Sequence, residues 1–332
     1  MSELRKDPFL ERWVIIAEER GQRPTTIQAA DTAADRSTCP FCAGNEAETE
    51  PEIFAVRDAD TAPNGPGWQV RVVPNRYPAL RPDAPDVAAV EENELLQRQP
   101  GVGHHEVIIE GPHTRSVSEI PTPEFAEVVG VYRERYRTLA KDDTLRSAVL
   151  IKNVGAAAGA SIEHSHSQLI ATPVLPMLLQ RELVTAAEWS KRHESCLWCS
   201  WLATEQTAGS RVVARNDYVT VLCPYAPRFP YETWLLPTQH ASHFEHADDA
   251  CVEVLAEMLH RSVTAIERCL GEPAYNYVVH SAPLGESTRS DYHWRMEVLP
   301  RVTRVAGYEQ ATGFYINPLS PERSAQELRA VF

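Results

Sequence analysis

Residues 161–173 read SIEHSHSQLIATP, so His164, His166 and Gln168 stand at every second position. Side chains two residues apart in an extended segment point to the same face, so these three would look into one space. A polar strand face turned to water would show the same alternation. Two imidazoles directly before the apolar run LIATP are unusual on such a face, and we interpret the stretch as part of a reactive site.

The loop just before this stretch is rich in small residues. It reads NVGAAAGAS (residues 153–161), with glycines at 155 and 159 among alanines. Small side chains let a ligand approach backbone N–H groups, which is one way in which proteins hold phosphate. A tight loop between strands would look the same. Beside a phosphate held there, the His166 imidazole could attack phosphorus and form a phosphoramidate, which splits a transfer into two easier steps.

Gln168 helps to choose between transfer and hydrolysis. A histidine at this position could act as an acid or a base toward water, whereas a glutamine only donates and accepts neutral hydrogen bonds. The sequence therefore favours a covalent intermediate that is kept for a second substrate. A hydrolase of dinucleoside polyphosphates and a zinc-stabilised binding module without catalysis are the alternatives.

Two Cys-x-x-Cys pairs, in CPFC and CLWC, account for four of the seven cysteines. Such a pair brings two thiolates to one tight turn, and two further ligands complete a tetrahedral zinc site. Histidines follow each pair in the same order. The expected sets are Cys39, Cys42, His105 (or His104) and His164 in the first half, and Cys196, Cys199, His240 (or His243) and His293 in the second.

Two other interpretations of the cysteine pairs fit less well. A redox Cys-x-x-Cys motif is expected once and in a βαβ setting, whereas the pair occurs twice here. A compact zinc ribbon would have its partner ligands a dozen or two residues away, not about 60. The remaining histidines have no such context and are expected on the surface; they are His113, His193, His246 and His260.

The order of these landmarks repeats along the chain. Each half presents a cysteine pair, a strand-like run, a helix of about five turns and further strand-like runs. The helical patterns cover residues 123–139 and 248–270, and residues 173–194 form a helical connection, while 81–100 read as a polar loop. We expect an α+β unit used twice, with halves at residues 1–175 and 176–332.

The duplication helps to distinguish residues with a structural role from residues that take part in the reaction. His293 of the second half corresponds to His164 as the last metal ligand, but Arg295 stands where the first half has His166. Two residues further, Glu297 stands in the place of Gln168. The metal set occurs in both halves and the His-Gln pair in one, so we infer that zinc is structural and that His166 performs the reaction.

Composition excludes several classes of partner. The chain has 332 residues, 43% of them hydrophobic and 23% charged, and a net charge of −14. A general nucleic-acid or acidic-membrane binder needs a positive field, so both are disfavoured. No apolar run reaches the roughly 18 residues of a membrane span, and the N-terminus lacks the apolar core of a signal peptide. We therefore expect a cytoplasmic protein.

The segment NVGAAAGASIEHSHSQ resembles the active-site segment of the galactose-1-phosphate uridylyltransferases, the nucleotidyltransferase branch of the histidine-triad superfamily. Further matches are RGQRP, CPFCAGNE, VVPNRYPAL, HHEVIIE, VVHSAP and GYEQATGFYINP, so the resemblance covers essentially the whole chain. It implies a duplicated histidine-triad-like α+β fold with two antiparallel-sheet halves, each with a long helix. It also implies ping-pong transfer of a nucleoside monophosphate between a nucleotide-sugar and a hexose 1-phosphate.

The resemblance also assigns roles by position. His166 would be the nucleophile, Gln168 would bind the phosphoryl oxygens, and each chain would hold two structural Zn²⁺ ions. Tyr308 and Glu309 match a segment that reaches the sugar in a neighbouring subunit, which implies a homodimer. The residues expected to line the substrate are Arg20, Arg23, Asn75, Asn153, Gly159 and Ser161.

Two departures from the family pattern bear on the nucleotide. Ser165 stands where uridylyltransferases usually have proline, and Arg295 and Glu297 stand where their second metal site has histidines, although His280 is present. The second cysteine-histidine set resembles instead that of the plant-type ADP-glucose phosphorylase branch, which also has the His-Ser-His-Ser-Gln form. A uridylyltransferase-type enzyme is the main expectation, and adenylyl transfer from ADP-glucose to inorganic phosphate is the alternative.

Overall fold

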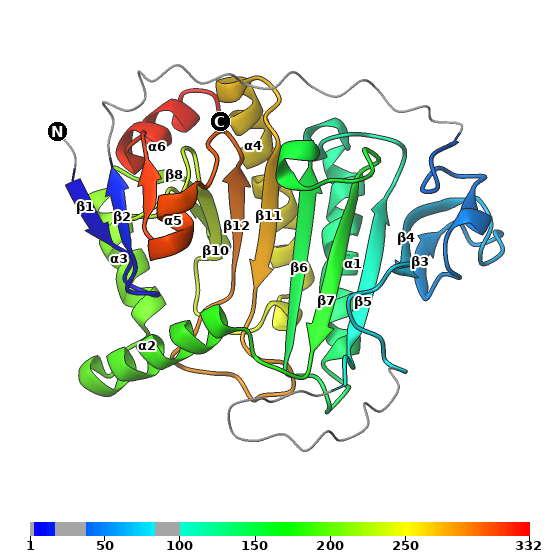
Figure 1. The fold of residues 1–332 in the computed structure, drawn as a ribbon, viewed down its shortest axis with the longest axis horizontal. Helices are drawn as coiled ribbons and strands as arrows, with labels where there is room; N and C mark the ends of the chain where they lie inside the picture. The colour runs from blue at the N-terminus through cyan, green and yellow to red at the C-terminus, as the bar shows by residue number, and fades with distance from the viewer. Residues whose placement is uncertain (1–2, 17–37, 84–99) are drawn as a thin grey trace.

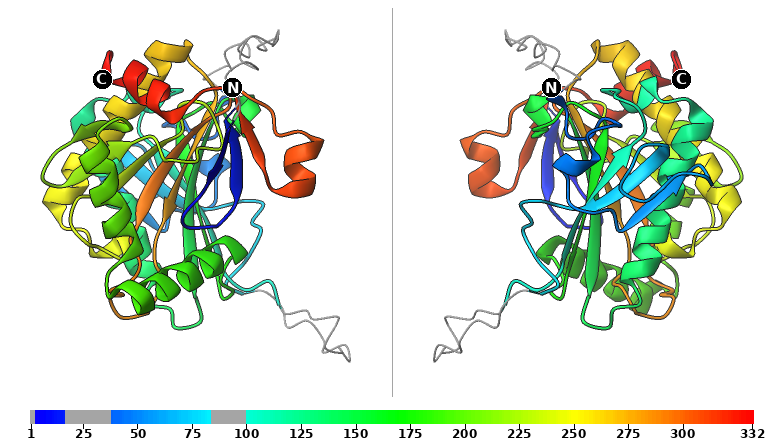
Figure 2. Two further views of the ribbon diagram at one scale, coloured as in Figure 1. Left: turned by 90° about the vertical axis from the view of Figure 1, so that its left-hand side faces the viewer. Right: turned by 90° about the vertical axis from the view of Figure 1, so that its right-hand side faces the viewer.

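The structure is a computed structural model that describes residues 3–16, 38–83 and 100–332. Arg20, Arg23 and most of the expected polar loop at 81–100 lie outside these residues. Most of the described chain is built around one large antiparallel sheet, with the two longest helices on one face and a small second sheet and further helices on the other (Figures 1 and 2).

The large sheet contains ten strands among the described residues, all paired antiparallel, in the order β3-β4-β5-β7-β6-β11-β12-β10-β9-β8. The strands of the first half are β3 Phe54–Arg57, β4 Trp68–Pro74, β5 His104–Glu110, β6 Ser147–Val154 and β7 His166–Thr172. Those of the second half are β8 Val212–Arg215, β9 Val219–Leu222, β10 Thr233–Pro237, β11 Tyr275–His280 and β12 Arg295–Pro300.

This strand order reads as the same five-strand unit used twice, back to back. From the centre outward, β6-β7-β5-β4-β3 on one side corresponds to β11-β12-β10-β9-β8 on the other. The halves are fused where β6 pairs with β11, with Asn153 opposite Asn276. Joining the two inner edge strands removes two exposed edges that could otherwise pair with other chains. The predicted duplicated antiparallel α+β architecture is therefore confirmed, as one continuous sheet.

One long helix of each half covers the same face of the sheet. They are α1 Thr122–Leu139 and α4 Asp249–Leu270, which pack against each other and against the sheet. Both match the helical patterns predicted from the sequence. The Asp248 carboxylate accepts the N–H of Cys251 and caps the start of α4, and Gly271 in the left-handed conformation ends it.

The rest of the described chain covers the other face and the ends of the second half (Figure 2). The predicted connection forms α2 Met177–His193, followed by α3 Leu197–Ala208. A three-stranded sheet brings together segments from near the two ends of the chain. In it β2 Trp13–Ile16 pairs antiparallel with β1 Glu3–Lys6 and parallel with β13 Tyr315–Asn317. The short helices are α5 Gly307–Thr312, α6 Pro321–Arg329 and the 3-10 turns η3 Glu46–Glu48, η4 Val117–Glu119, η5 Ala156–Ala158 and η6 Phe244–His246.

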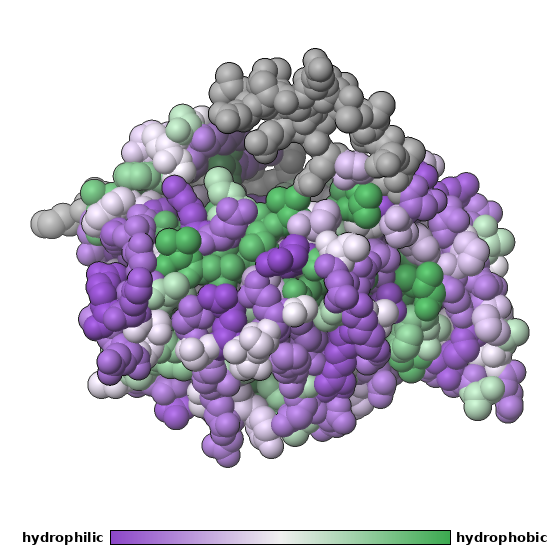
Figure 3. All heavy atoms as spheres, turned by 90° about the horizontal axis from the view of Figure 1, so that it is seen from below, coloured by the Kyte–Doolittle hydropathy of each residue, from purple (hydrophilic) through white to green (hydrophobic). Residues whose placement is uncertain are grey.

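The surface seen from below in Figure 1, where α2 lies, mixes charged side chains with apolar ones (Figure 3). Exposed apolar residues at the start of α2 include Val174, Met177 and Leu178. Within the described ranges, none of the helices has the combination of length and apolar character that a membrane span requires.

Candidate functional site

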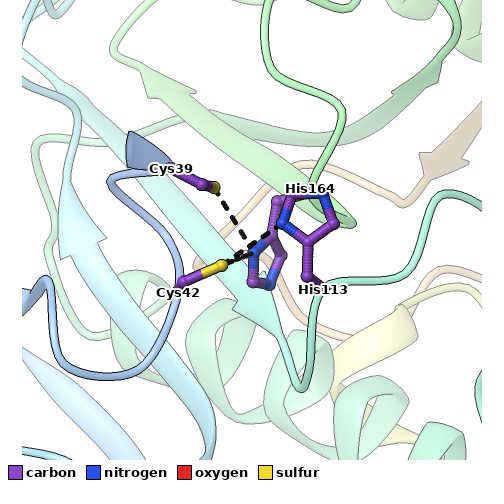
Figure 4. A group of neighbouring side chains, drawn as sticks. All are labelled: Cys39, Cys42, His113 and His164. Atoms are coloured by element: carbon purple, nitrogen blue, oxygen red, sulfur yellow. Dashed lines mark hydrogen bonds between the residues drawn. The ribbon is translucent and has the colours of Figure 1, made fainter. Parts of the chain in front are cut away.

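The first cysteine-histidine cluster consists of Cys39, Cys42, His113 and His164 (Figure 4). Their candidate ligand atoms all lie within 4.8 Å of one another. The Nδ1 atom of His164 is 3.6 Å from Cys39 Sγ and 3.7 Å from Cys42 Sγ, and Nδ1 of His113 is 3.2 Å from Cys42 Sγ. Two thiols and two imidazoles so placed match the donor set of a tetrahedral structural zinc site.

His113 thus stands where His105 was expected. A surface position was predicted for His113, but the chain turns at Gly111, whose φ is 77°, directly after β5 and brings His113 back to the cysteines. His105 lies on β5 and makes its contacts with Gln168 and Ala79 instead. The signal available in the sequence was the short Gly-Pro-His segment directly after the strand.

The second cluster brings together Cys196, Cys199 and His240, with Cys199 Sγ 3.3 Å from Nδ1 of His240. His293 packs next to His240, with ring centroids 5.6 Å apart. Its Nε2 atom is buried and has no hydrogen-bond partner. Because a buried imidazole nitrogen without a partner is costly, this atom suits the fourth position of a metal site. His243, the other histidine considered, hydrogen-bonds Ser242 instead.

Both clusters share the arrangement that metal-binding histidines need. The Nε2–H of His164 donates to the carbonyl of Gly111 at 2.9 Å, and the Nε2–H of His240 donates to the carbonyl of Arg289, also at 2.9 Å. Each of these bonds leaves the Nδ1 lone pair directed at the cysteines. Burial lowers the pKa of His164 to about 4, so its imidazole is neutral, as a ligand must be.

His166 begins β7 and is buried on the face of the sheet opposite to α1. Its Nδ1–H donates to the carbonyl of His164 at 2.8 Å, so the lone pair of a neutral ring stands on Nε2. Burial lowers the pKa of His166 and favours this neutral form. The ring of Phe41 packs edge-on against it, with centroids 5.1 Å apart. The side chain is therefore fixed with one nucleophilic nitrogen.

Along β7 the side chains alternate as predicted. Ser167 points to the helices, where its hydroxyl lies 2.8 Å from Tyr132 OH of α1. His166 and Gln168 therefore share the opposite face. Gln168 accepts a hydrogen bond from Nε2 of His105 at 2.8 Å. His164, which precedes the strand, belongs to the first cysteine-histidine cluster, so the three alternating residues lie in two neighbouring sites.

A buried ion pair lies under the loop that carries His166, and sequence reasoning missed it. Lys152 of β6 and Glu110 at the end of β5 are fully buried and form a salt bridge. The Lys152 ammonium also donates to Ser165 Oγ at 2.8 Å and to the His166 carbonyl at 3.3 Å. Burial opposes the charge of Glu110, but Lys152 outweighs it and holds the pKa of this carboxyl below its usual value. The signal available in the sequence was a charged residue in each of two apolar strand runs, Glu110 at the end of HHEVIIE and Lys152 in SAVLIKN.

The small-residue loop follows β6 as expected. Gly155 and Gly159 adopt φ values of 79° and 89°, and a Cβ at Gly155 would come within 2.9 Å of Ala274. Nδ2 of Asn276 donates to Oδ1 of Asn153 at 2.7 Å and to the Ala158 carbonyl at 2.8 Å. A strand of the second half thereby supports the loop. Ser161 is exposed at its far end.

The other expected substrate residues lie in two places. Asn75 follows β4, and its Nδ2 is 3.2 Å from Nε2 of His105, so it belongs to the neighbourhood of Gln168. Tyr308 and Glu309 lie on α5, where Tyr308 is 49% exposed and Glu309 accepts the N–H of Ala306. Helix α5 stands beside the small sheet rather than beside β7 (Figure 1).

The second half has no counterpart of the His-Gln pair at the equivalent positions on β12. Arg295 stands there, buried between Glu182 and Glu297, with Nη2 2.6 Å and Nε 2.8 Å from their oxygens. Arg228 binds the other oxygen of Glu297. Each charge is neutralised, which is what burial requires. These ion pairs connect β12 to α2.

The comparisons with known proteins agree with this arrangement. The N-terminal domain model of galactose-1-phosphate uridyl transferase matches residues 1–176. ADP-glucose phosphorylase from Arabidopsis thaliana is 35% identical over 99% of this chain and 93% of its own. Galactose-1-phosphate uridylyltransferase from Thermotoga maritima is 26% identical over 99% of this chain and 98% of its own. A crystal structure of the Arabidopsis enzyme with bound ADP-glucose superposes with a TM-score of 0.85, at 33% identity, over 100% of this chain and 99% of that one.

The duplicated antiparallel fold and the relatives, which are named uridylyltransferase and ADP-glucose phosphorylase, identify the chain as a nucleotidyltransferase-type enzyme. The chain belongs to the galactose-1-phosphate uridylyltransferase family.

Proposed function

We propose that the protein moves a nucleoside monophosphate from a nucleotide-sugar to a phosphate-bearing acceptor through a covalent nucleotidyl-His166. The observation that carries this proposal is the hydrogen bond from Nδ1–H of His166 to the His164 carbonyl. It leaves Nε2 as the nucleophilic atom of a neutral, buried ring, beside a glutamine and a small-residue loop that suit a phosphoryl group.

The two steps balance without an external acid or base. Nε2 of His166 attacks the α-phosphorus of the donor, the new P–N bond forms, and the bond to the sugar phosphate breaks so that sugar 1-phosphate leaves as an oxyanion. An acceptor phosphate oxygen then attacks the same phosphorus, and the P–N bond breaks. The proton stays on Nδ1 of His166 throughout, where it remains hydrogen-bonded to the His164 carbonyl. Leaving group and acceptor are both phosphates, so neither needs a proton from the protein.

We propose ADP-glucose as the donor and inorganic phosphate as the acceptor. The support is the higher identity to the ADP-glucose phosphorylase, 35%, than to the Thermotoga uridylyltransferase, 26%. The second cysteine-histidine cluster and the Ser165 of the His-Ser-His-Ser-Gln segment fit that branch as well. A UDP-sugar with a hexose 1-phosphate is the second candidate, supported by the family domain that matches residues 1–176.

We also propose Zn²⁺ as the metal of both clusters and a homodimer as the active form. Two thiols and two imidazoles per site favour Zn²⁺, which would crosslink distant segments and perform no chemistry. In the first cluster the metal would fix His164, whose carbonyl orients His166. In the dimer, Tyr308 and Glu309 would reach the sugar in the neighbouring subunit.

The test is to incubate the purified protein with ADP-glucose and phosphate, and separately with UDP-glucose and galactose 1-phosphate, and to separate the products by chromatography. The proposal expects ADP and glucose 1-phosphate from the first mixture and no product with the His166→Ala variant. Turnover of the second mixture alone would assign the uridylyltransferase activity. Release of free monophosphate without any acceptor would instead support a hydrolase.

A further inference from the structure

His105 has both ring nitrogens committed to protein atoms, neither of them in the cysteine-histidine clusters. It lies half-buried on β5, one strand away from Gln168 of β7. Its Nδ1 atom is 3.0 Å from the backbone nitrogen of Ala79, and its Nε2 atom is 2.8 Å from Oε1 of Gln168. These contacts determine its tautomer.

The backbone N–H of Ala79 can only donate, so Nδ1 must be the nitrogen without a proton. A neutral imidazole then carries its proton on Nε2 and donates it to Gln168. Only the oxygen of an amide can accept this bond, so Oε1 faces His105. Asn75 Nδ2 lies 3.2 Å from the same nitrogen, but as a donor it does not compete for the proton. Its own oxygen accepts the N–H of Tyr77 at 2.8 Å.

We propose that His105 is a positioning residue that fixes the amide of Gln168 with its NH₂ group directed at the phosphoryl group on His166. This inference rests on the proposed function and names a residue that it did not assign. A free glutamine amide can turn over and present its oxygen, whose lone pairs would repel a phosphate. The hydrogen bond from His105 removes that orientation, so the donor is in place before the substrate arrives.

The placement of the two side chains on the sheet supports this role. In the register of β5 and β7, Gln168 lies opposite Val107 and His105 opposite Ile170, so the two are diagonal neighbours on one face. His166 shares this face, opposite Ile109. Diagonal neighbours are within reach of long side chains. The strand pairing therefore places His105 within reach of Gln168. It also places Gln168 on the same face as His166.

Three variants separate this role from that of a metal ligand. His105→Leu removes the donor, and His105→Gln offers an amide N–H near the former Nε2 position. We expect His105→Leu to slow formation of the nucleotidyl-enzyme from ADP-glucose by about 10-fold to 100-fold, and His105→Gln to restore part of the rate. Both should keep the wild-type zinc content, whereas His113→Ala should lose one equivalent. A loss of zinc from His105→Leu would overturn the inference.

A double-mutant cycle with Gln168→Ala tests whether His105 acts through Gln168. If it does, adding His105→Leu to Gln168→Ala causes no further loss of rate. Independent effects that multiply would refute the positioning role while leaving the covalent mechanism intact. If the wild-type protein forms no adduct with either ADP-glucose or UDP-glucose, the proposed function fails, and this inference fails with it.

Discussion

At the scale of single residues, the reactive character of His166 comes from hydrogen bonds rather than from a neighbouring charge. The His164 carbonyl accepts the hydrogen bond from Nδ1–H, burial favours the neutral ring, and Phe41 packs against it. Gln168 supplies an uncharged donor on the same strand face. This combination suits attack on phosphorus and stabilisation of a negatively charged phosphoryl group, and the amide of Gln168 cannot act as a base toward water.

Replacing the amide of Gln168 by a carboxylate tests this division of roles. Gln168→Glu keeps the acceptor for His105 but puts negative charge where a donor should meet the phosphoryl oxygens. We expect formation of the nucleotidyl-enzyme to slow by about 10²-fold to 10³-fold, with melting temperature and zinc content unchanged. Quenched-flow measurement of the first step checks this. A rate close to that of the wild type would show that Gln168 does not contact the phosphoryl group.

At the scale of elements, strand pairing brings the site together and buried ion pairs fasten it. Lys152 and Glu110 tie β6 and β5 to the loop carrying Ser165 and His166. In the second half, Glu297 of β12 lies between Arg295 and Arg228, and Arg295 connects it to Glu182 of α2. The equivalent places in the two halves thus hold His166, the proposed nucleophile, in one case and a buried charge cluster in the other.

The charge cluster of β12 makes stability depend on pH. Burial opposes ionisation of Glu297, but Arg228, His280 and Arg295 outweigh it and hold the pKa of this carboxyl well below its usual value. A lowered folded-state pKa gives stability that is complete above the unfolded pKa and is lost as the pH falls through the folded one.

We therefore expect Glu297→Gln to lower the free energy of unfolding by about 3–5 kcal/mol at neutral pH, because it leaves buried guanidinium groups without their partner. The difference from the wild type should shrink as the pH falls below about 4.5, since the unfolded wild-type chain then binds a proton at this carboxyl while the folded protein keeps it ionised. Urea unfolding at several pH values measures both. A difference that stays constant with pH would contradict the account.

The elements were more predictable than the contacts between them. Apolar periodicity located α1 and α4 because each must bury one face, and alternation located β5 and β7. The prediction of His105 rather than His113 as the third member of the first cluster was wrong. The two histidines are only eight residues apart in sequence, so spacing alone does not distinguish them. Only the turn at Gly111 decides which one meets the cysteines. The ion pair of Lys152 and Glu110 depends on strand register, which sequence spacing alone does not give.

At the scale of the whole molecule, the two cysteine-histidine clusters differ in exposure. Cys39 and His164 of the first cluster are buried, whereas His240 of the second is exposed and Cys199 is partly so. A chelator reaches exposed ligands first. The first cluster also lies beside the reactive face, since His164 is two residues from His166.

We therefore expect a chelator to remove two equivalents of zinc in two phases, the faster one from the second cluster, with transfer activity surviving the fast phase. A chromogenic chelator follows the release. His240→Ala should abolish the fast phase, with His113→Ala as the matched variant of the slow one. A fast phase that survives in His240→Ala would show that exposure does not set the order of release.

The exposed position of Tyr308 on α5 leads to a prediction about assembly. If each site takes Tyr308 from its neighbour, mixing inactive His166→Ala with impaired Tyr308→Ala protein creates dimers with one intact site. After exchange of subunits, activity should rise to about a quarter of the wild-type value, because half of the dimers are mixed and each has one complete site. Activity that never exceeds the mean of the two variants would place Tyr308 outside a shared site.

The most direct test of the central claim is the intact mass of the protein after mixing with ADP-glucose, or separately with UDP-glucose, without acceptor and without acid. The account predicts a gain of one nucleoside monophosphate, expected to be AMP, in the wild type and no gain in His166→Ala. Addition of phosphate should remove the adduct. No mass gain with either donor, or the same gain in His166→Ala, would contradict a nucleotidyl-His166 intermediate.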